Sequence, residues 1–349
     1  MIFCYNLLMK QYIKNILIYI IVAVTFLAVG YFFTHQYDLS QTKKIIATIV
    51  PVRENNFDYK FIYPLLTYNL SQALPFLENK TLTNKINDYV QLQYKNNSAQ
   101  TIGVYYRNLL TNGWAGINQD VKFHPGSMMK VMIMMAYYRE SQLDPAIMQK
   151  EFNYSKDINQ VLVQQSYATP SSLVVGQSYN TKYLIEKMIE DSDNGAEVLL
   201  YNNVNVNILN DVYRDLSLPI PDETNQNYTI SARQYTAFLR ILYNSTYLAE
   251  LNSEEALSIM SKSTYNDGIY AGVPSNIVVA EKYGERVDTD SSGKNISSVE
   301  LSNCGIVYAT SPYTLCVMTK GQNDPKNLAS IIKDISGIVY NYVSLGANK

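Results

Sequence analysis

The longest uninterrupted apolar stretch of the chain lies near its N-terminus, from Ile16 to Phe33. These 18 residues carry no charge, and this length is at the lower limit of what spans a bilayer as a helix. Lys10 and Lys14 precede the stretch, a distribution that favours a cytoplasmic N-terminus. We therefore expect residues 1–15 to be a cytoplasmic tail and residues 16–33 to be an uncleaved, single-pass signal anchor.

A cleaved signal peptide is the alternative, because Ala28-Val29-Gly30 resembles a cleavage site. The apolar residues that follow at once, beginning with Tyr31, favour the anchor. Residues 34–76 have scattered apolar positions without a long period, and they predict a stem. Its apolar set is expected to dock onto the following domain: Phe61, Ile62, Tyr63, Leu65 and Leu66.

The remaining pattern predicts strands at both ends and helices in the middle. Residues 77–97 place Leu82, Ile86, Tyr89 and Val90 on one side of a helix. Strands are expected at 101–110, 114–121, 276–287, 303–310 and 313–319, with a turn at Asn112-Gly113. Further helices are expected at 127–140, 181–190, 196–209, 231–243 and 325–345. This order predicts an α+β fold with an antiparallel sheet.

The composition and charge of the chain argue against several classes of function. The formal net charge is −2 and the predicted pI is about 5.8, and no basic cluster interleaved with aromatic residues is present, so no nucleic-acid partner is expected. The two histidines, His35 and His124, are too few for a catalytic zinc site, and we expect neither a metal nor another cofactor. A Ser-His-Asp triad could use only His124, because His35 lies beside the apolar segment.

The helix that follows Ser127 breaks the amphipathic rule. Residues 128–138 are apolar nearly all round apart from Lys130, which predicts a helix buried in a core. Lys130 lies in the first turn, where the helix dipole and burial both favour a neutral amine. A neutral amine one turn from a serine hydroxyl can act as its general base, and N–H groups at the helix start could hold an oxyanion.

The alternative is that Ser127 is an N-cap and that Lys130 extends outward to solvent. Ser-x-x-Lys alone is a weak indication, because the same spacing recurs elsewhere in the chain, as at Ser40 and Lys43. A cap, however, does not explain a lysine in an otherwise apolar helix.

Two further short motifs follow in order. Ser192-Asp193-Asn194 lies between predicted helices, where Asn194 could instead be an N-cap with Glu197 in a capping box. Lys282-Tyr283-Gly284 closes a predicted strand, where the lysine could instead be a solvated residue of an edge strand.

Together, Ser127-x-x-Lys130, Ser192-Asp193-Asn194 and Lys282-x-Gly284 resemble the three-motif signature of active-site serine β-lactamases and penicillin-binding D,D-peptidases. The order and the separations are most similar to those of the class A β-lactamases. The resemblance covers residues 77–349 and implies a β-lactamase-like catalytic domain. Its fold would be a five-stranded antiparallel sheet flanked by helices, plus an all-helical domain from about residue 127 to 263.

The resemblance also implies a role for each motif residue. Ser127 would attack the substrate carbonyl, Lys130 would help to remove its proton, and Ser192 would relay a proton to the leaving nitrogen. Asn194 would bind the substrate amide and orient Lys130, while Lys282 would hold Ser192 and attract the substrate carboxylate. Substrate binding and the oxyanion hole would involve Asp193, Tyr283, Gly284, Glu285 and Arg286, with the N–H groups of Ser127 and Glu285 facing the oxyanion.

The chain departs from the class A pattern in two places. Tyr283 stands where a short hydroxyl would bind the substrate carboxylate, and Glu285, where a small residue is normal, could repel that carboxylate unless Arg286 offsets it. The Glu-x-x-Leu-Asn context of the deacylating glutamate is missing after Asn194. Asp222 and Glu223 are the candidate bases, although carboxylates in a polar loop are commonly only solvated.

Cys304 and Cys316 flank a predicted turn at residues 310–312. They would face each other on adjacent strands if the turn centres near Thr310, and outside the cytoplasm they could then form a disulfide. We favour two buried free thiols, because strand register cannot be derived this finely from sequence.

We expect a serine hydrolase of the class A β-lactamase type that is acylated at Ser127 and hydrolyses the β-lactam amide. The alternatives are a D,D-peptidase or transpeptidase acting on cell-wall peptide, and a non-hydrolytic envelope protein that binds β-lactam or peptide. The expected partners are therefore a small β-lactam or a cell-wall peptide, and the cell membrane through the anchor. The catalytic domain is expected to be extracytoplasmic and monomeric.

Overall fold

The structure is a computed structural model that describes residues 14, 15, 18, 21–32, 34, 52, 53, 59–67, 77–156, 167, 171–221, 228–289, 296–322 and 324–346. It divides into two compact units. The first comprises residues 1–52 and 66–75, and the second comprises residues 53–65 and 76–349. All three predicted motifs lie in the second unit.

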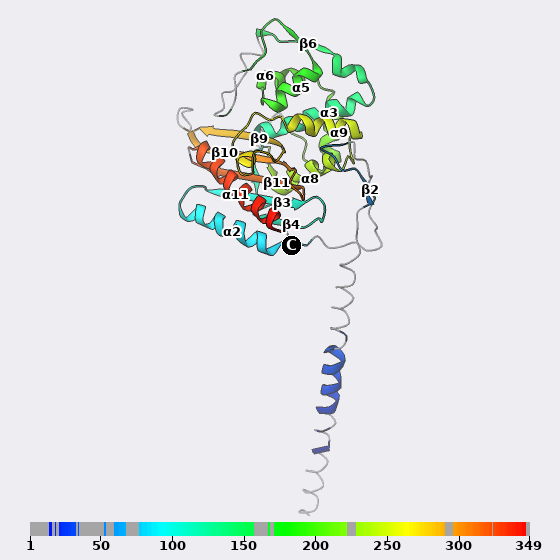
Figure 1. The fold of residues 1–349 in the computed structure, drawn as a ribbon, viewed down its shortest axis with the longest axis vertical. Coiled ribbons are helices and arrows are strands. Elements are labelled where there is room, and N and C mark those ends of the chain that lie inside the picture. The colour runs from blue at the N-terminus through cyan, green and yellow to red at the C-terminus, as the bar shows by residue number, and fades with distance from the viewer. Residues whose placement is uncertain are drawn as a thin grey trace, which may run out of the picture. The chain divides into compact units, whose positions relative to one another are not determined.

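The second unit is built around a five-stranded antiparallel sheet with the strand order β4-β3-β11-β10-β9 (Figure 1). The strands are β3 (Thr101–Asn108), β4 (Trp114–Ile117), β9 (Val279–Thr289), β10 (Ile296–Val307) and β11 (Tyr313–Gly321). β3 and β11 are buried along almost their whole length, because helices cover both faces of the sheet. Two strands precede the helical region and three follow it, which confirms the predicted α+β arrangement.

Helices pack on each face of this sheet. α2 (Lys80–Lys95) and α11 (Pro325–Gly346) lie together on one face, where Leu82, Ile86 and Val90 enter a core shared with the sheet, as their spacing predicts. α8 (Ala232–Tyr243) packs against β3, β10 and β11 and brings Tyr235 and Phe238 into a second core. The motif-bearing elements belong to this second core.

The chain between β4 and β9 forms the helical part. Among its described residues the helices are α3 (Lys130–Ser141), α5 (Thr181–Glu190), α6 (Asn194–Tyr201), α7 (Val206–Asp215), α8, α9 (Glu250–Met260) and α10 (Gly268–Ala271). They are joined by 3-10 turns at Gly126–Met129 and Pro145–Gln149 and by short strand pairs, β5 (Lys122–Phe123) with β8 (Ile230–Ser231) and β6 (Glu151–Asn153) with β7 (Ser178–Asn180). α3 is buried from Lys130 to Tyr138, which explains why residues 131–138 are apolar on all sides of the helix. The predicted continuous helix at 196–209 is wrong, because Asn205 caps α7 and separates it from α6.

Cys304 and Cys316 form a disulfide, so the expectation of two free thiols is wrong. The two residues are directly opposite each other on β10 and β11, which is the register that a turn centred near residue 310 requires. Both are fully buried, and Cys304 is also paired in register with Lys282 on β9. The cross-link therefore joins β11 to β10, the strand that pairs with the third motif on β9.

Residues 59–65 pack against the helical part of the second unit. Phe61 and Ile62 are buried, as expected of a docking segment. The carboxylate of Glu254 accepts hydrogen bonds from their backbone N–H groups at 2.8 and 3.0 Å, and Tyr63 N donates to Tyr243 O at 2.8 Å. This part of the predicted stem thus contributes to the compact domain.

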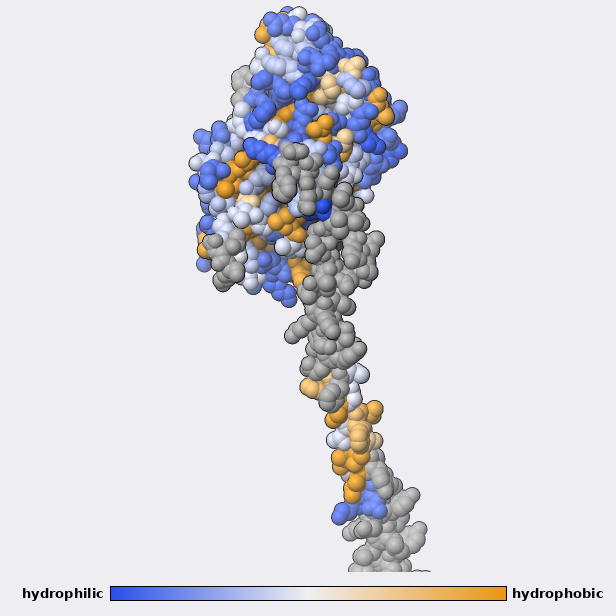
Figure 2. Space-filling view, turned by 45° about the vertical axis from the view of Figure 1, so that its right-hand side comes forward, coloured by the Kyte–Doolittle hydropathy of each residue, from blue (hydrophilic) through white to orange (hydrophobic). Residues whose placement is uncertain are grey.

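In the first unit, residues 21–32 are helical and expose large apolar side chains, among them Phe26, Leu27 and Tyr31 (Figure 2). Within the part of the chain that the structure describes, no helix is both long enough and apolar enough to span a bilayer. Some residues of the predicted anchor and most of the predicted cytoplasmic tail lie outside the described residues. The signal anchor therefore stays a prediction.

Candidate active site

Ser127 lies in a 3-10 turn, Gly126–Met129, that leads into α3. It is not an N-cap, because the cap position of the turn is Pro125 and that of α3 is Met129, so this alternative is wrong. Gly126 has a φ of +52°, which an L side chain rarely adopts, and a Cβ there would lie 2.6 Å from Glu285 O. The glycine therefore allows β9 to pack against the turn that presents Ser127, whose exposed fraction is 4%.

Lys130 is fully buried, so the predicted alternative in which it reaches solvent is wrong. Its Nζ donates to Ser192 O at 2.6 Å and to Asn194 Oδ1 at 2.7 Å. The same nitrogen lies 3.3 Å from Glu197 Oε2 and 3.4 Å from Ser192 Oγ. Three of these four oxygens belong to the second motif, which thus surrounds the lysine of the first.

Burial lowers the pKa of Lys130, while the nearby carboxylates of Glu197 and Asp193 act in the opposite direction. A buried amine loses much of the hydration that stabilises its charged form. The site therefore brings Lys130 closer to the neutral state that a general base requires, and keeps proton acceptors within reach of its nitrogen.

Ser192 joins the two lysines of the site. Its Oγ accepts a hydrogen bond from Lys282 Nζ at 2.8 Å, and Lys130 Nζ approaches the same oxygen at 3.4 Å. Ser192 has a φ of +57°, a left-handed conformation that is uncommon for a residue other than glycine. Backbone strain of this kind is retained where the surroundings over-determine it, commonly at functional sites.

Asp193 stabilises the start of α6, the helix that carries Asn194. It is the N-cap of α6, and its Oδ1 accepts from Ala196 N at 3.0 Å, so the alternative with Asn194 as N-cap is wrong. Its other oxygen accepts from Ser171 Oγ at 2.9 Å and from Ser172 N at 3.0 Å. These bonds hold the start of α6, and with it Asn194, against Lys130.

Lys282 is fully buried, although β9 is an edge strand, so the solvated-lysine alternative is also wrong. Burial lowers its pKa well below the ordinary value, and the charge of Lys130 acts in the same direction. Gly284, two residues further on, could not carry a side chain, because a Cβ would lie 1.9 Å from Pro125 O. β9 thus lies directly against the serine turn.

Tyr283 and Glu285, which differ from the class A pattern in sequence, are held by contacts within the protein, as is Arg286. Tyr283 is 4% exposed, stacks on Tyr265 with ring centroids 4.2 Å apart, and donates its hydroxyl proton to Tyr167 O at 3.0 Å. Glu285 is 2% exposed and its Oε2 accepts from Tyr167 N at 3.3 Å. Arg286 forms a 2.8 Å ion pair with Asp288.

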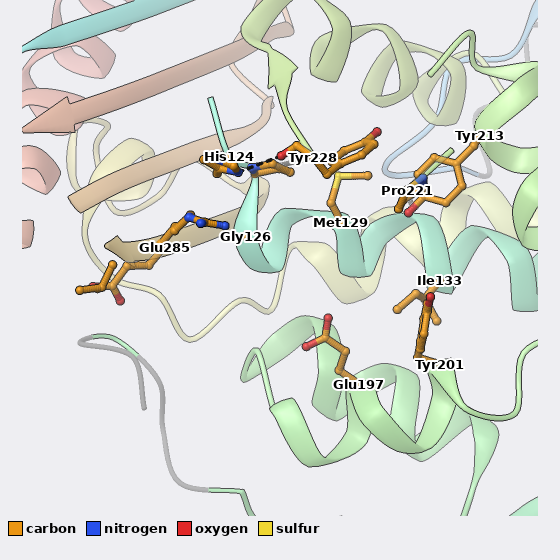
Figure 3. Close-up of a pocket in the computed structure, with 13 residues that line it drawn as sticks. His124, Gly126, Met129, Ile133, Glu197, Tyr201, Tyr213, Pro221, Tyr228 and Glu285 are labelled. Carbon is orange, nitrogen blue, oxygen red and sulfur yellow. Dashed lines mark hydrogen bonds between the residues drawn. The ribbon is translucent and has the colours of Figure 1, made fainter. Parts of the chain in front are cut away.

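A cavity of about 610 Å³ is lined in part by Gly126 and Met129 of the turn that carries Ser127 (Figure 3). The residues that line it come from the serine turn, α3, α6, α7, β9 and neighbouring loops: His124, Pro125, Gly126, Met129, Ile133, Glu197, Tyr201, Tyr213, Pro221, Tyr228, Glu285, Arg286 and Val287. Figure 3 shows Glu197 and Tyr201 on α6 facing the helix that carries Ile133. The cavity is large enough for a small ligand.

The structure brings together the side chains of four predicted residues, Lys130, Ser192, Asn194 and Lys282. Ser127 lies in the turn that leads into the helix of Lys130. Asp222 and Glu223, the candidate deacylating bases, lie outside the described residues. The sequence interpretation missed the contact of Glu197 with Lys130, because it considered this glutamate only as part of a capping box. Its spacing of three residues from Asn194 places both on one face of α6, which is the signal that could have found it.

Residues 81–343 match the model of the Beta-lactamase enzyme family. Among solved structures, the chain is similar to PBP-A, with 20% identity, a TM-score of 0.64 and coverage of 78% of this chain and 100% of that one. It is also similar to a class A β-lactamase from Mycobacterium abscessus, with 18% identity, a TM-score of 0.61 and coverage of 75% and 99%. No curated protein gives a significant match.

The matches to solved structures have low identity, so they bear on the fold. They confirm the β-lactamase-like arrangement of sheet and helices that the three motifs imply. The family match spans the whole sheet, every helix of the site and all three motifs. On this ground, the chain belongs to the Beta-lactamase enzyme family.

Proposed function

We propose that the protein is a serine hydrolase that is acylated at Ser127 by β-lactams and hydrolyses the β-lactam amide. The observation that carries this proposal is the buried network in which Lys130 and Lys282 meet at Ser192, beside the turn that presents Ser127. Burial of both lysines disfavours their charged forms. A neutral amine next to a buried serine is the base that a serine nucleophile needs.

In the proposed acylation step, the Lys130 amine takes the hydroxyl proton while Ser127 Oγ bonds to the lactam carbonyl carbon. The N–H groups of Ser127 and Glu285 would stabilise the resulting oxyanion. The carbon–nitrogen bond then breaks, and the proton passes from Lys130 through the Ser192 hydroxyl to the leaving nitrogen. The 3.4 Å approach of Lys130 Nζ to Ser192 Oγ supports this route.

Lys282 has two proposed tasks. Its 2.8 Å hydrogen bond orients the Ser192 hydroxyl, and its charge, when protonated, would attract a substrate carboxylate. The Tyr283 hydroxyl is already bonded to Tyr167 O, so the strand lacks the short hydroxyl that the class A pattern places there.

A D,D-peptidase acting on cell-wall peptide is the second candidate. The absence of the Glu-x-x-Leu-Asn context after Asn194 favours it, because an acyl-enzyme that lacks the usual deacylating glutamate would persist. The fold is shared with PBP-A as well as with class A enzymes. The same acylation machinery would serve this function, with a longer-lived acyl-enzyme.

We also propose that this domain acts outside the cytoplasm, attached through residues 16–33. The Cys304–Cys316 disulfide supports this location, because structural disulfides persist mainly in oxidising compartments. The uncharged 18-residue stretch supports the attachment. Selective labelling of intact cells with a membrane-impermeant reagent would test the location, and labelling only after lysis would contradict it.

Turnover of nitrocefin by the purified full-length chain tests the choice between the two functions. Many turnovers per molecule support the hydrolase, and one slow burst supports the D,D-peptidase. A Ser127→Ala variant is the matched control for both outcomes. If a fluorescent penicillin fails to label the folded wild-type protein, both functions are contradicted.

A further inference from the structure

The carboxylate of Glu197 is placed where a deacylating base could work. Its Oε2 lies 3.3 Å from Lys130 Nζ, and its side chain is 33% exposed. One part of the Glu197 side chain therefore contacts the buried Lys130 amine, and another part is accessible to solvent. A base that activates water needs both properties, since it must exchange a proton with the site and admit a water molecule.

The α6 backbone directs this side chain toward Lys130. Asn194 and Glu197 are three residues apart and thus project from the same face of the helix. Both reach Lys130 Nζ, Asn194 at 2.7 Å. The Asp193 cap fixes the first turn of α6 through its bond from Ala196 N, so the position of Glu197 is set by a regular helix.

Glu197 also lines the cavity beside the serine turn, together with Gly126 and Met129, which flank Ser127 in sequence (Figure 3). Among the described residues that line this cavity, the other carboxylate is Glu285. Glu285 is 2% exposed and accepts a hydrogen bond from Tyr167 N, so its access to water is much smaller than that of Glu197.

We infer that Glu197, carried by α6, is the catalytic carboxylate that activates water for hydrolysis of the Ser127 acyl-enzyme. The inference rests on the proposed acylation of Ser127 and adds the residue that completes turnover. It assigns this role to a helix that follows the second motif, rather than to Asp222 or Glu223.

Glu197 takes a proton from water while the water oxygen bonds to the acyl carbon, and the ester bond from that carbon to Ser127 Oγ then breaks. The proton passes from the Glu197 carboxyl through Lys130, at 3.3 Å, to the released Ser127 oxygen. Water is consumed, the acid is released, and both Glu197 and Ser127 return to their starting states.

The test follows the mass of the full-length protein over time after a pulse of benzylpenicillin, which separates formation of the adduct from its loss. In Glu197→Gln the adduct should form at a rate within about threefold of wild type. Its loss should slow by about 100-fold or more, the usual contribution of a positioned base. Glu197→Asp, which keeps a carboxylate on a shorter stem, should recover part of the rate.

Glu255→Gln is the matched control, because Glu255 also pairs with a lysine, Lys182, and has a similar exposed fraction of 35%. It lies on α9 and should lose its adduct as fast as wild type. Thermal unfolding of each variant verifies that the fold is retained.

Two results would overturn the inference while leaving acylation intact. One is an equal rate of adduct loss in wild type and Glu197→Gln, including the case in which neither loses it. The other is a defect confined to adduct formation, which would give Glu197 only the task of holding Lys130. Absence of an adduct on folded wild-type protein would instead overturn the proposed function itself, and the inference with it.

Discussion

The helical side of the site, formed by the serine turn, α3 and α6, and its strand side, formed by β9, differ in what surrounds their lysines. Lys130 has a carbonyl, an amide and a partly exposed carboxylate as neighbours. Lys282 donates to Ser192 Oγ and to its neighbour's carbonyl, Tyr283 O. Lys130 thus contacts a carboxylate that reaches solvent, and we propose that Lys282 serves mainly to position Ser192.

This difference separates two tasks that a serine acyl-enzyme must perform. The helical side retains the groups that the family pattern requires for activating the nucleophile. On the strand side, Tyr283 is part of an aromatic cluster with Tyr265 and Tyr167, so the usual contact with a substrate carboxylate is replaced. Substitutions on the helical side should therefore affect the chemistry more than those on the strand side.

Lys130→Met should have the largest effect among the substitutions that keep Ser127. Removal of the general base should slow acylation by about 10²- to 10⁴-fold. The free energy of unfolding should be unchanged or higher, because an apolar side chain of similar length replaces a buried amine. Stopped-flow measurement of acylation and urea unfolding would check these two results.

Lys182→Met is the control for this substitution, because Lys182 is a largely exposed lysine on α5 with one carboxylate partner. It should acylate at the wild-type rate. Rapid acylation of a folded Lys130→Met protein would contradict the proposal that the helical side of the site transfers the proton.

Lys282→Met should have an intermediate effect. It removes a charge-capable hydrogen bond to Ser192 Oγ, a loss of about 1.5–3 kcal/mol, which corresponds to about 10- to 100-fold in acylation rate. The same rate measurement checks it. If Lys282→Met lowers the acylation rate more than Lys130→Met does, the result would contradict this comparison and indicate that Lys282 is the principal proton acceptor.

Glu281, on β9, should make the free energy of unfolding depend on pH. This glutamate is fully buried, and desolvation raises its pKa from 4.5 to about 8. Between these values the folded state binds the proton that the unfolded state has lost, so this group's contribution to stability falls as pH rises from about 5 to 8. Glu281→Gln should remove that fall, and urea unfolding at pH 5 and pH 8 would show a flatter profile. Equal slopes for both proteins would contradict the raised pKa.

Tyr283→Phe should have the smallest effect on activity. It removes the hydroxyl that donates to Tyr167 O but keeps the ring stacked on Tyr265. The free energy of unfolding should fall by about 1 kcal/mol, while acylation should stay within about twofold. A tenfold weaker reaction with penicillins that carry a carboxylate would instead show that this hydroxyl contacts the substrate.

The features that depend on local sequence patterns could be predicted from the sequence. The sheet strands, the buried α3 and the three motifs follow from apolar runs and short spacings. Asn194 was named as the alternative cap of α6 in place of Asp193, and free thiols were favoured over the Cys304–Cys316 disulfide, because a cap's identity depends on backbone angles and a disulfide depends on strand register. The contact of Glu197 with Lys130 joins residues 67 positions apart, and only the tertiary arrangement of α3 and α6 brings them together.

Peptide mapping of the full-length protein after reaction with benzylpenicillin, with Ser127→Ala as the parallel sample, tests whether Ser127 is the nucleophile. We predict a single penicilloyl adduct, located on Ser127 in the wild type and absent from the variant. An adduct on another residue, or none on folded wild-type protein, would contradict the account.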